Sequence, residues 1–129
     1  MTQTSTKIPA FEDAYLAESV ETLPPEIVHA LPFGAIRLDA GGRVIFYSDT
    51  ERRQSGYRSE VMGHDFFTDI APCMSNPNFR GRIDRALAAG KLDISFGYVV
   101  EVASGEMDLD VRVQSSASGG CWIFLRRPA

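Results

Sequence analysis

The sequence predicts an α+β domain: a five-stranded antiparallel sheet with helical segments on one side and an N-terminal cap. Three observations predict it: two strand-like segments joined by a glycine-rich turn, a middle region of short helices, and three alternating segments near the end. The chain has 129 residues, enough for one packed core and too few for two domains. We therefore expect a cap over residues 1–30 and one core over residues 31–129.

The cap is predicted to contain short helices that pack loosely. Residues 1–10 are expected to fray, and the next segment has only a modest apolar stripe. The stripe consists of Phe11, Tyr15, Leu16 and Val20. Pro24-Pro25 ends this helix, and Pro25 begins a second short turn through Ala30. Because apolar residues are few, this segment is expected to cover the core and not to build it.

The sheet is predicted to begin at Gly34. Its first elements are a strand over residues 35–39, a hairpin turn at 40–42 and a returning strand over 43–48. Residues 49–72 lose the alternation of a strand. They contain short helical pieces broken by Gly56, Gly63 and Pro72.

One longer helix and three strands complete the chain. Asn76-Pro77 predicts a capped helix start, and Gly90 predicts its end. The expected buried stripe of this helix is Phe79, Ile83, Ala86 and Leu87. The strands are expected over residues 94–102, 107–113 and 121–125. The last strand is apolar on both faces, which predicts a central place in the sheet.

Composition and charge exclude several classes of function. The net charge of −4 argues against a nucleic-acid-binding face, which would be basic. No apolar run approaches the roughly 18 residues of a membrane span. The first thirty residues lack the pattern of a secretory signal, so a cytoplasmic protein is expected. The two cysteines and two histidines lack the spacing of a metal site, and no metal is expected.

Three residues could carry chemistry together: Tyr47, Glu51 and Cys73. A thiol, a phenol and a carboxyl in an apolar neighbourhood can hold a covalently attached acidic aromatic ligand and manage its proton. Glu51 can donate a hydrogen bond only when protonated, and burial would raise its pKa. After losing the proton it would be a buried, unpaired carboxylate, a strained state that can drive local unfolding.

Each of these residues also has a purely structural interpretation. A single cysteine is most often a small buried apolar residue, as we expect for Cys121. Tyr47 could end a strand with its hydroxyl in water, and Glu51 could be a solvated acid at a helix start. Taken singly, these interpretations are favoured. The three residues in register with the sequence around Cys73 favour the chemical one.

The order of elements is similar to the PAS arrangement, in which ligands lie between the sheet and the helical middle segment. Within it, the run Phe66-Phe67-Thr68-Asp69-Ile70-Ala71-Pro72-Cys73, in register with Tyr47 and Glu51, resembles the photoactive yellow protein family. Shorter matching segments are Leu31 to Asp39, Phe79-Arg80-Gly81, Ala89 to Leu92, Phe96-Gly97-Tyr98 and Trp122-Ile123-Phe124. The likeness covers roughly residues 31–129.

The resemblance implies a blue-light photoreceptor. It implies one p-coumaric acid (4-hydroxycinnamic acid) per chain, bound as a thioester to Cys73, with its phenolate hydrogen-bonded by Tyr47 and a protonated Glu51. Blue light would isomerise the ligand from trans to cis, Glu51 would give up its proton, and the cap would loosen. The remaining residues expected at the chromophore pocket are Ser55, Tyr57, Phe66, Phe67, Phe96 and Tyr98.

The sequence departs from the family pattern at three places. Ser55 replaces a threonine and should still hydrogen-bond Tyr47. Tyr57 stands where the family has an arginine that shields the pocket. Either one of Arg52, Arg53 and Arg58 replaces that arginine or an aromatic ring closes the pocket. Neither Ser104 nor Gly105 supplies the methionine that speeds dark recovery, so slow recovery is expected.

Two rival functions remain open. One is a PAS module that binds a non-covalent ligand or a protein partner. The other is a cysteine-dependent enzyme, which is disfavoured because neither His29 nor His64 occupies a motif position that suggests a base for Cys73. The resemblance also implies a downstream signalling module. This module could be a phytochrome-like protein or histidine kinase in the same chain, or a separate partner.

Overall fold

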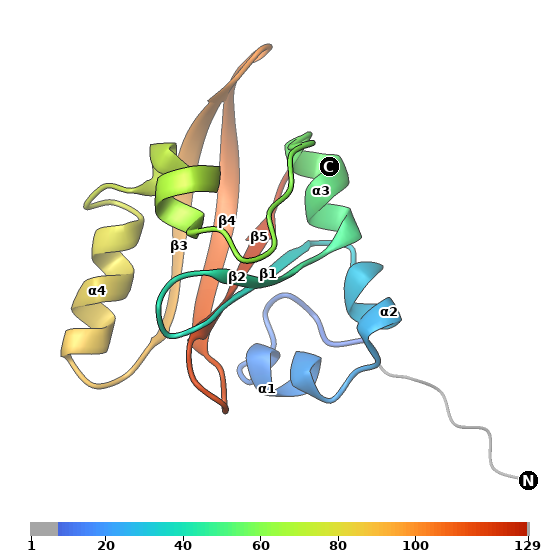
Figure 1. The fold of residues 1–129 in the computed structure, drawn as a ribbon, viewed down its shortest axis with the longest axis vertical. Helices are drawn as coiled ribbons and strands as arrows, with labels where there is room; N and C mark the ends of the chain where they lie inside the picture. The colour runs from blue at the N-terminus through green and yellow to red at the C-terminus, as the bar shows by residue number, and fades with distance from the viewer. Residues whose placement is uncertain (1–7, 129) are drawn as a thin grey trace, which may run out of the picture.

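A computed structural model describes residues 8–128 and shows a five-stranded antiparallel sheet with helices packed on it (Figure 1). The elements are α1 (Leu16–Glu21), α2 (Pro25–His29), β1 (Gly34–Leu38), β2 (Val44–Tyr47), α3 (Asp49–Ser55), η1 (Phe66–Ile70), η2 (Pro72–Met74), α4 (Arg80–Ala88), β3 (Asp93–Val102), β4 (Gly105–Ser115) and β5 (Cys121–Arg126). The strand order is β2-β1-β5-β4-β3. The predicted fold class and the central place of the last strand are confirmed.

The sheet separates two hydrophobic cores. Along β5, Ile123 and Leu125 belong to the core under α3, η1 and α4, whereas Trp122 and Phe124 belong to the core under the cap. Successive side chains of a strand point to opposite faces, so a strand that is apolar throughout contributes to both cores. This double burial is the physical reason why β5 lies at the centre of the sheet.

The expected loose packing of the cap is wrong. A second core beneath it contains Phe11, Leu16, Ala17, Val20, Val28, Leu31, Phe33, Ala35, Trp122 and Phe124. Polar groups of β4 reinforce it: Arg112 Nη1 donates to the carbonyls of Phe11 and Asp13 at 2.8 and 2.6 Å. Residues outside the cap supply half of this core, three of them from strands β1 and β5, and the cap sequence alone does not reveal them. Residues 1–7 of the expected cap lie outside the described residues.

Helix α3 positions the candidate acid. Ser48 caps its first turn, because the Ser48 Oγ accepts a hydrogen bond from the Glu51 backbone N–H at 3.1 Å. Gly56 ends the helix with a φ of +71°, a left-handed conformation that glycine adopts without a Cβ penalty. Tyr47 therefore ends β2 and Glu51 lies in the helical turn that follows, as the spacing predicted.

The longer helix has a narrower buried face than predicted. The Asn76 Oδ1 accepts hydrogen bonds from the backbone N–H groups of Asn78 and Phe79, but α4 begins only at Arg80, so the predicted start at Asn76-Pro77 is too early. Phe79 and Ile83 are buried, but Leu87 is 54% exposed, so its predicted place in the core is wrong. Helix α4 packs beside the edge strand β3, which offers only a narrow surface to cover.

None of the helices within residues 8–128 has the length and apolar character needed to span a bilayer.

Candidate functional site

Tyr47 has the surroundings that the sequence predicts. Its ring is buried at the end of β2, and its Oη lies 3.2 Å from the Ser55 Oγ, which confirms the expected hydrogen bond. Burial raises the pKa of the Tyr47 hydroxyl above its ordinary value. The phenol therefore keeps its proton and can act as a hydrogen-bond donor.

Glu51 is almost completely enclosed, with 3% of its surface exposed. Its side chain lies against the backbone of Gly34, where a Cβ would collide with the Glu51 Oε1. The absence of a side chain at Gly34 is thus what allows the carboxyl to lie beside the start of β1.

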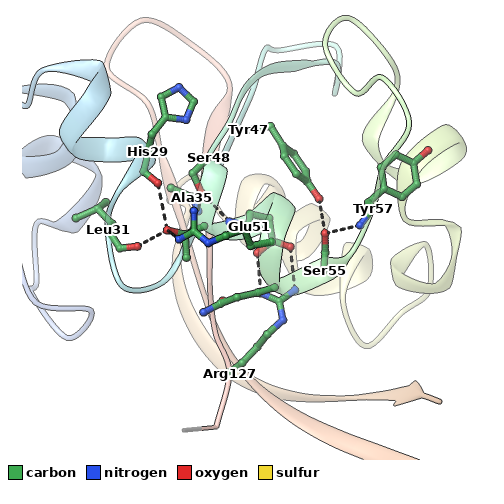
Figure 2. Close-up of polar contacts among 12 residues, drawn as sticks. His29, Leu31, Ala35, Tyr47, Ser48, Glu51, Ser55, Tyr57 and Arg127 are labelled. Carbon is green, nitrogen blue, oxygen red and sulfur yellow. Dashed lines mark hydrogen bonds and ion pairs between the residues drawn. The ribbon is translucent and has the colours of Figure 1, made fainter. Parts of the chain in front are cut away.

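Arg127 binds this carboxyl, a contact that the sequence analysis missed. Its Nη1 and Nη2 donate to the Glu51 Oε1 and Oε2 at 2.7 and 2.9 Å, a two-pronged ion pair (Figure 2). The signal was present in the sequence: position 127 continues the alternation of Ile123 and Leu125, which face the core beneath α3. Extending the period by one step would have placed Arg127 on the side of Glu51.

Two opposing effects act on the pKa of Glu51. Burial raises it, the hydrogen bonds and charge of Arg127 lower it, and the balance lies above the ordinary carboxyl value. The direction agrees with the expectation from sequence. The environment differs from that expectation, because an arginine is in contact with the acid.

Cys73 lies in η2. It is exposed, and its thiol is free. Its backbone carbonyl accepts hydrogen bonds from the Tyr98 Oη and the Asn76 Nδ2, both at 2.8 Å. Asn76 and Tyr98 also bond to each other at 2.6 Å. Tyr98 and Asn76 therefore hold the backbone of the cysteine turn to strand β3. The sequence analysis gave Asn76 only a helix-capping role.

A chain of aromatic rings runs from η1 to the edge strand β3. The ring pairs, all at edge-on angles, are Phe66–Phe67, Phe67–Phe79, Phe79–Phe96 and Phe79–Tyr98, with centroids 5.1 to 6.1 Å apart. Phe66 and Phe67 are buried, whereas Phe96 and Tyr98 are half-buried because β3 is the edge strand. Four of the predicted pocket residues, Phe66, Phe67, Phe96 and Tyr98, thus form one continuous aromatic wall with Phe79 at its centre.

Tyr57 and Arg52 connect α3 to its neighbouring segments. The Tyr57 Oη donates to the Asp69 carbonyl at 3.4 Å, which joins the loop after α3 to η1. Arg52 lies over the Tyr47 ring at 5.4 Å and donates to the Tyr57 carbonyl at 3.4 Å. Arg53 instead contacts Thr50. Arg52 thus contacts both Tyr47 and Tyr57, and the identity of the group that shields the pocket stays a prediction.

The structure brings some predicted residues together and not others. Tyr47 and Ser55 are in contact, and Cys73 and Tyr98 are in contact. Among residues 8–128, no hydrogen bond or ion pair joins Cys73 to Tyr47 or Glu51. Cys121 is buried in the core as predicted, and burial raises its thiol pKa to about 11. Within the described part of the chain, only Cys73 combines a free thiol with exposure.

The chain is similar to photoactive yellow proteins along most of its length. The photoactive yellow protein of Halochromatium salexigens is 32% identical over 114 residues, which is 87% of this chain and 91% of that protein. The one from Rhodothalassium salexigens is 35% identical over 99 residues, 75% of this chain and 79% of that protein. No protein-family model matches the chain.

Solved structures give the same relationship. The photoactive yellow protein domain of the sensor histidine kinase Ppr from Rhodospirillum centenum superposes with a TM-score of 0.76 at 34% identity. The match covers 85% of this chain and 98% of that domain. An RNA-binding light-oxygen-voltage receptor superposes with a TM-score of 0.62 at 13% identity, which shows a shared PAS-like fold alone.

Proposed function

The chain belongs to the photoactive yellow protein family, and from this premise we propose that it is a blue-light photoreceptor carrying p-coumaric acid as a thioester on Cys73. Its membership and its PAS-like fold identify a sensory domain. The observation that carries the finer proposal is the presence in one domain of an exposed free thiol, Cys73, together with a buried phenol, Tyr47, and a buried carboxyl, Glu51. We also propose the division into a cap, residues 1–30, and a photosensor core, residues 31–129.

The residues present fit this ligand. Cys73 is exposed, so an activated acid can reach its thiol. If Ser55 donates to the Tyr47 Oη, the Tyr47 O–H remains free to donate to a ligand oxygen. The wall formed by Phe67, Phe79 and Phe96 suits an aromatic ring. When bound, the ligand would supply light absorption and trans–cis isomerisation.

The protein's own groups would control charge and protons. Tyr47 would stabilise a buried negative oxygen by donating its hydroxyl proton in a short, charge-assisted hydrogen bond. Glu51 would hold a proton on its carboxyl in the dark and release it after illumination. The Tyr98 and Asn76 contacts would keep the backbone at Cys73 fixed while this happens.

The cysteine assignment is tested by loading the chain with activated p-coumaric acid. We expect a yellow protein whose mass increases by one coumaroyl group. Cys73→Ala should abolish both the colour and the added mass, because no other exposed thiol occurs among residues 8–128. Cys121→Ala is the matched control and should keep both, because that thiol is buried. A parent chain that takes up no pigment would favour a PAS module with a non-covalent ligand or protein partner.

A second prediction concerns the hairpin between β3 and β4. Placing methionine at Ser104 should speed dark recovery several-fold if the missing methionine is what slows it. Ser104 is preferable to Gly105, whose φ of +125° would strain any side chain. Flash photolysis of the loaded protein measures the rate, and an unchanged recovery would contradict the prediction.

The downstream output follows from the relatives by analogy. The superposed structure from Rhodospirillum centenum is a domain of a sensor histidine kinase. We propose a comparable signalling module as the partner of this chain, attached in cis or acting in trans. A cytoplasmic location, with no nucleic acid or membrane as partner, completes the proposal.

A further inference from the structure

Arg127 lies directly after β5 and reaches the region between the sheet and α3. In addition to its two bonds to Glu51, its Nη1 donates to the Gln54 Oε1 at 3.2 Å. Only 11% of the Arg127 side chain is exposed, against 3% for Glu51. The ion pair is therefore largely removed from water. In this low-dielectric environment the two charges attract each other strongly.

The guanidinium supplies what a buried carboxylate requires. An ionised carboxyl without a partner is costly in the interior, and a planar arginine fork matches both of its oxygens. The Arg127 Nε is buried without a hydrogen-bond partner. The Arg127 side chain is thus held mainly through its two terminal nitrogens. The strength of their hydrogen bonds to Glu51 depends on the negative charge of that carboxyl. If Glu51 took up a proton, most of that attraction would be lost.

We propose that Arg127 is the counter-ion of Glu51 after this carboxyl has released its proton, and that it thereby sets how long the released state lasts. This proposal rests on the photoreceptor function proposed above. It corrects the expectation that the released carboxylate would be unpaired. Arg127 acts through Glu51 and is therefore a positioning residue.

The neighbouring arginine provides a matched control. Arg126 points to the other face of the sheet, where it forms ion pairs with Asp110 and Glu12 and its guanidinium lies over the Phe11 ring. Arg126→Gln removes the same charge from the same segment without touching Glu51. A difference between the variants at positions 126 and 127 therefore reports on Glu51 and not on net charge.

The first measurement uses the full chain without pigment. Infrared difference spectra against a Glu51→Gln counterpart isolate the absorption of this carboxyl. The pigment's negative oxygen, which would keep Glu51 protonated in the dark, is not present in this pigment-free chain. At neutral pH we therefore expect a carboxylate in the parent and in Arg126→Gln, and a protonated acid in Arg127→Gln. Arg127→Lys keeps the charge and should restore the carboxylate. If Arg127→Gln shows the same protonation state as the parent, the proposal is overturned.

The second measurement uses the pigment-loaded chain and flash photolysis. Without its counter-ion the released state should be less stable, so Arg127→Gln should recover in the dark about tenfold faster than the parent. This factor corresponds to an activation free energy lower by about 1.4 kcal/mol. Arg127→Lys should recover at an intermediate rate, and Arg126→Gln close to the parent. Equal rates for the two glutamine variants would overturn the proposal. If the parent takes up no pigment, the photoreceptor function fails, and the infrared measurement still decides the role of Arg127.

Discussion

Replacing Glu51 by glutamine is expected to shift the dark absorption maximum of the pigment-loaded protein while the pigment stays attached to Cys73. An amide is a weaker hydrogen-bond donor than a carboxylic acid to a negative oxygen, so the charge distribution of the bound ligand should change. Attachment should persist, because no hydrogen bond or ion pair joins Glu51 to Cys73 within residues 8–128. A visible spectrum and the mass of the intact protein measure the two effects.

The same substitution should also destabilise the fold. The Arg127 side chain, which is only 11% exposed, would lose its negative partner. Removal of one partner from a buried ion pair typically lowers the free energy of unfolding by about 3 kcal/mol. Denaturant unfolding of the chain without pigment measures this loss. Glu60→Gln is the control: Glu60 is exposed and should change neither the colour nor the stability. A Glu51→Gln spectrum identical to that of the parent would show that Glu51 does not contact the pigment.

Replacing Phe79 by alanine is expected to lower the free energy of unfolding by about 3–5 kcal/mol. Phe79 is completely buried, and its ring contacts those of Phe67, Phe96 and Tyr98. The deletion leaves a cavity in the aromatic wall and removes all three edge-on contacts. The wall adjoins the cysteine turn through Tyr98, so slower pigment uptake should accompany the lost stability.

Leu87→Ala in the same helix is the matched control. Leu87 is 54% exposed, so its truncation should change the free energy of unfolding by less than about 0.5 kcal/mol. Urea unfolding curves of the two variants, compared with the parent, measure the difference. Similar losses for both variants would contradict the prediction that Phe79 is a core residue and Leu87 a surface residue.

The strands and their faces could be predicted because alternation is a local property of a strand. It located β5 at the centre of the sheet, whereas the Tyr47–Ser55 contact was expected from the family resemblance. Helical periodicity, in contrast, failed for Leu87 and for the packing of the cap. In both cases the outcome depends on how much of a distant surface covers the segment.

By itself, the sequence determined the fold class, the order of the elements and the candidate site residues, because periodicity and side-chain type are local properties of the sequence. Only the tertiary structure decided that Arg127 pairs with Glu51 across 76 positions, and that Gly34 makes room for that carboxyl. Such pairings depend on which strands become neighbours and on which charges lose their water together. A residue that no local pattern around Glu51 contains therefore opposes the rise that burial causes in the pKa of this carboxyl.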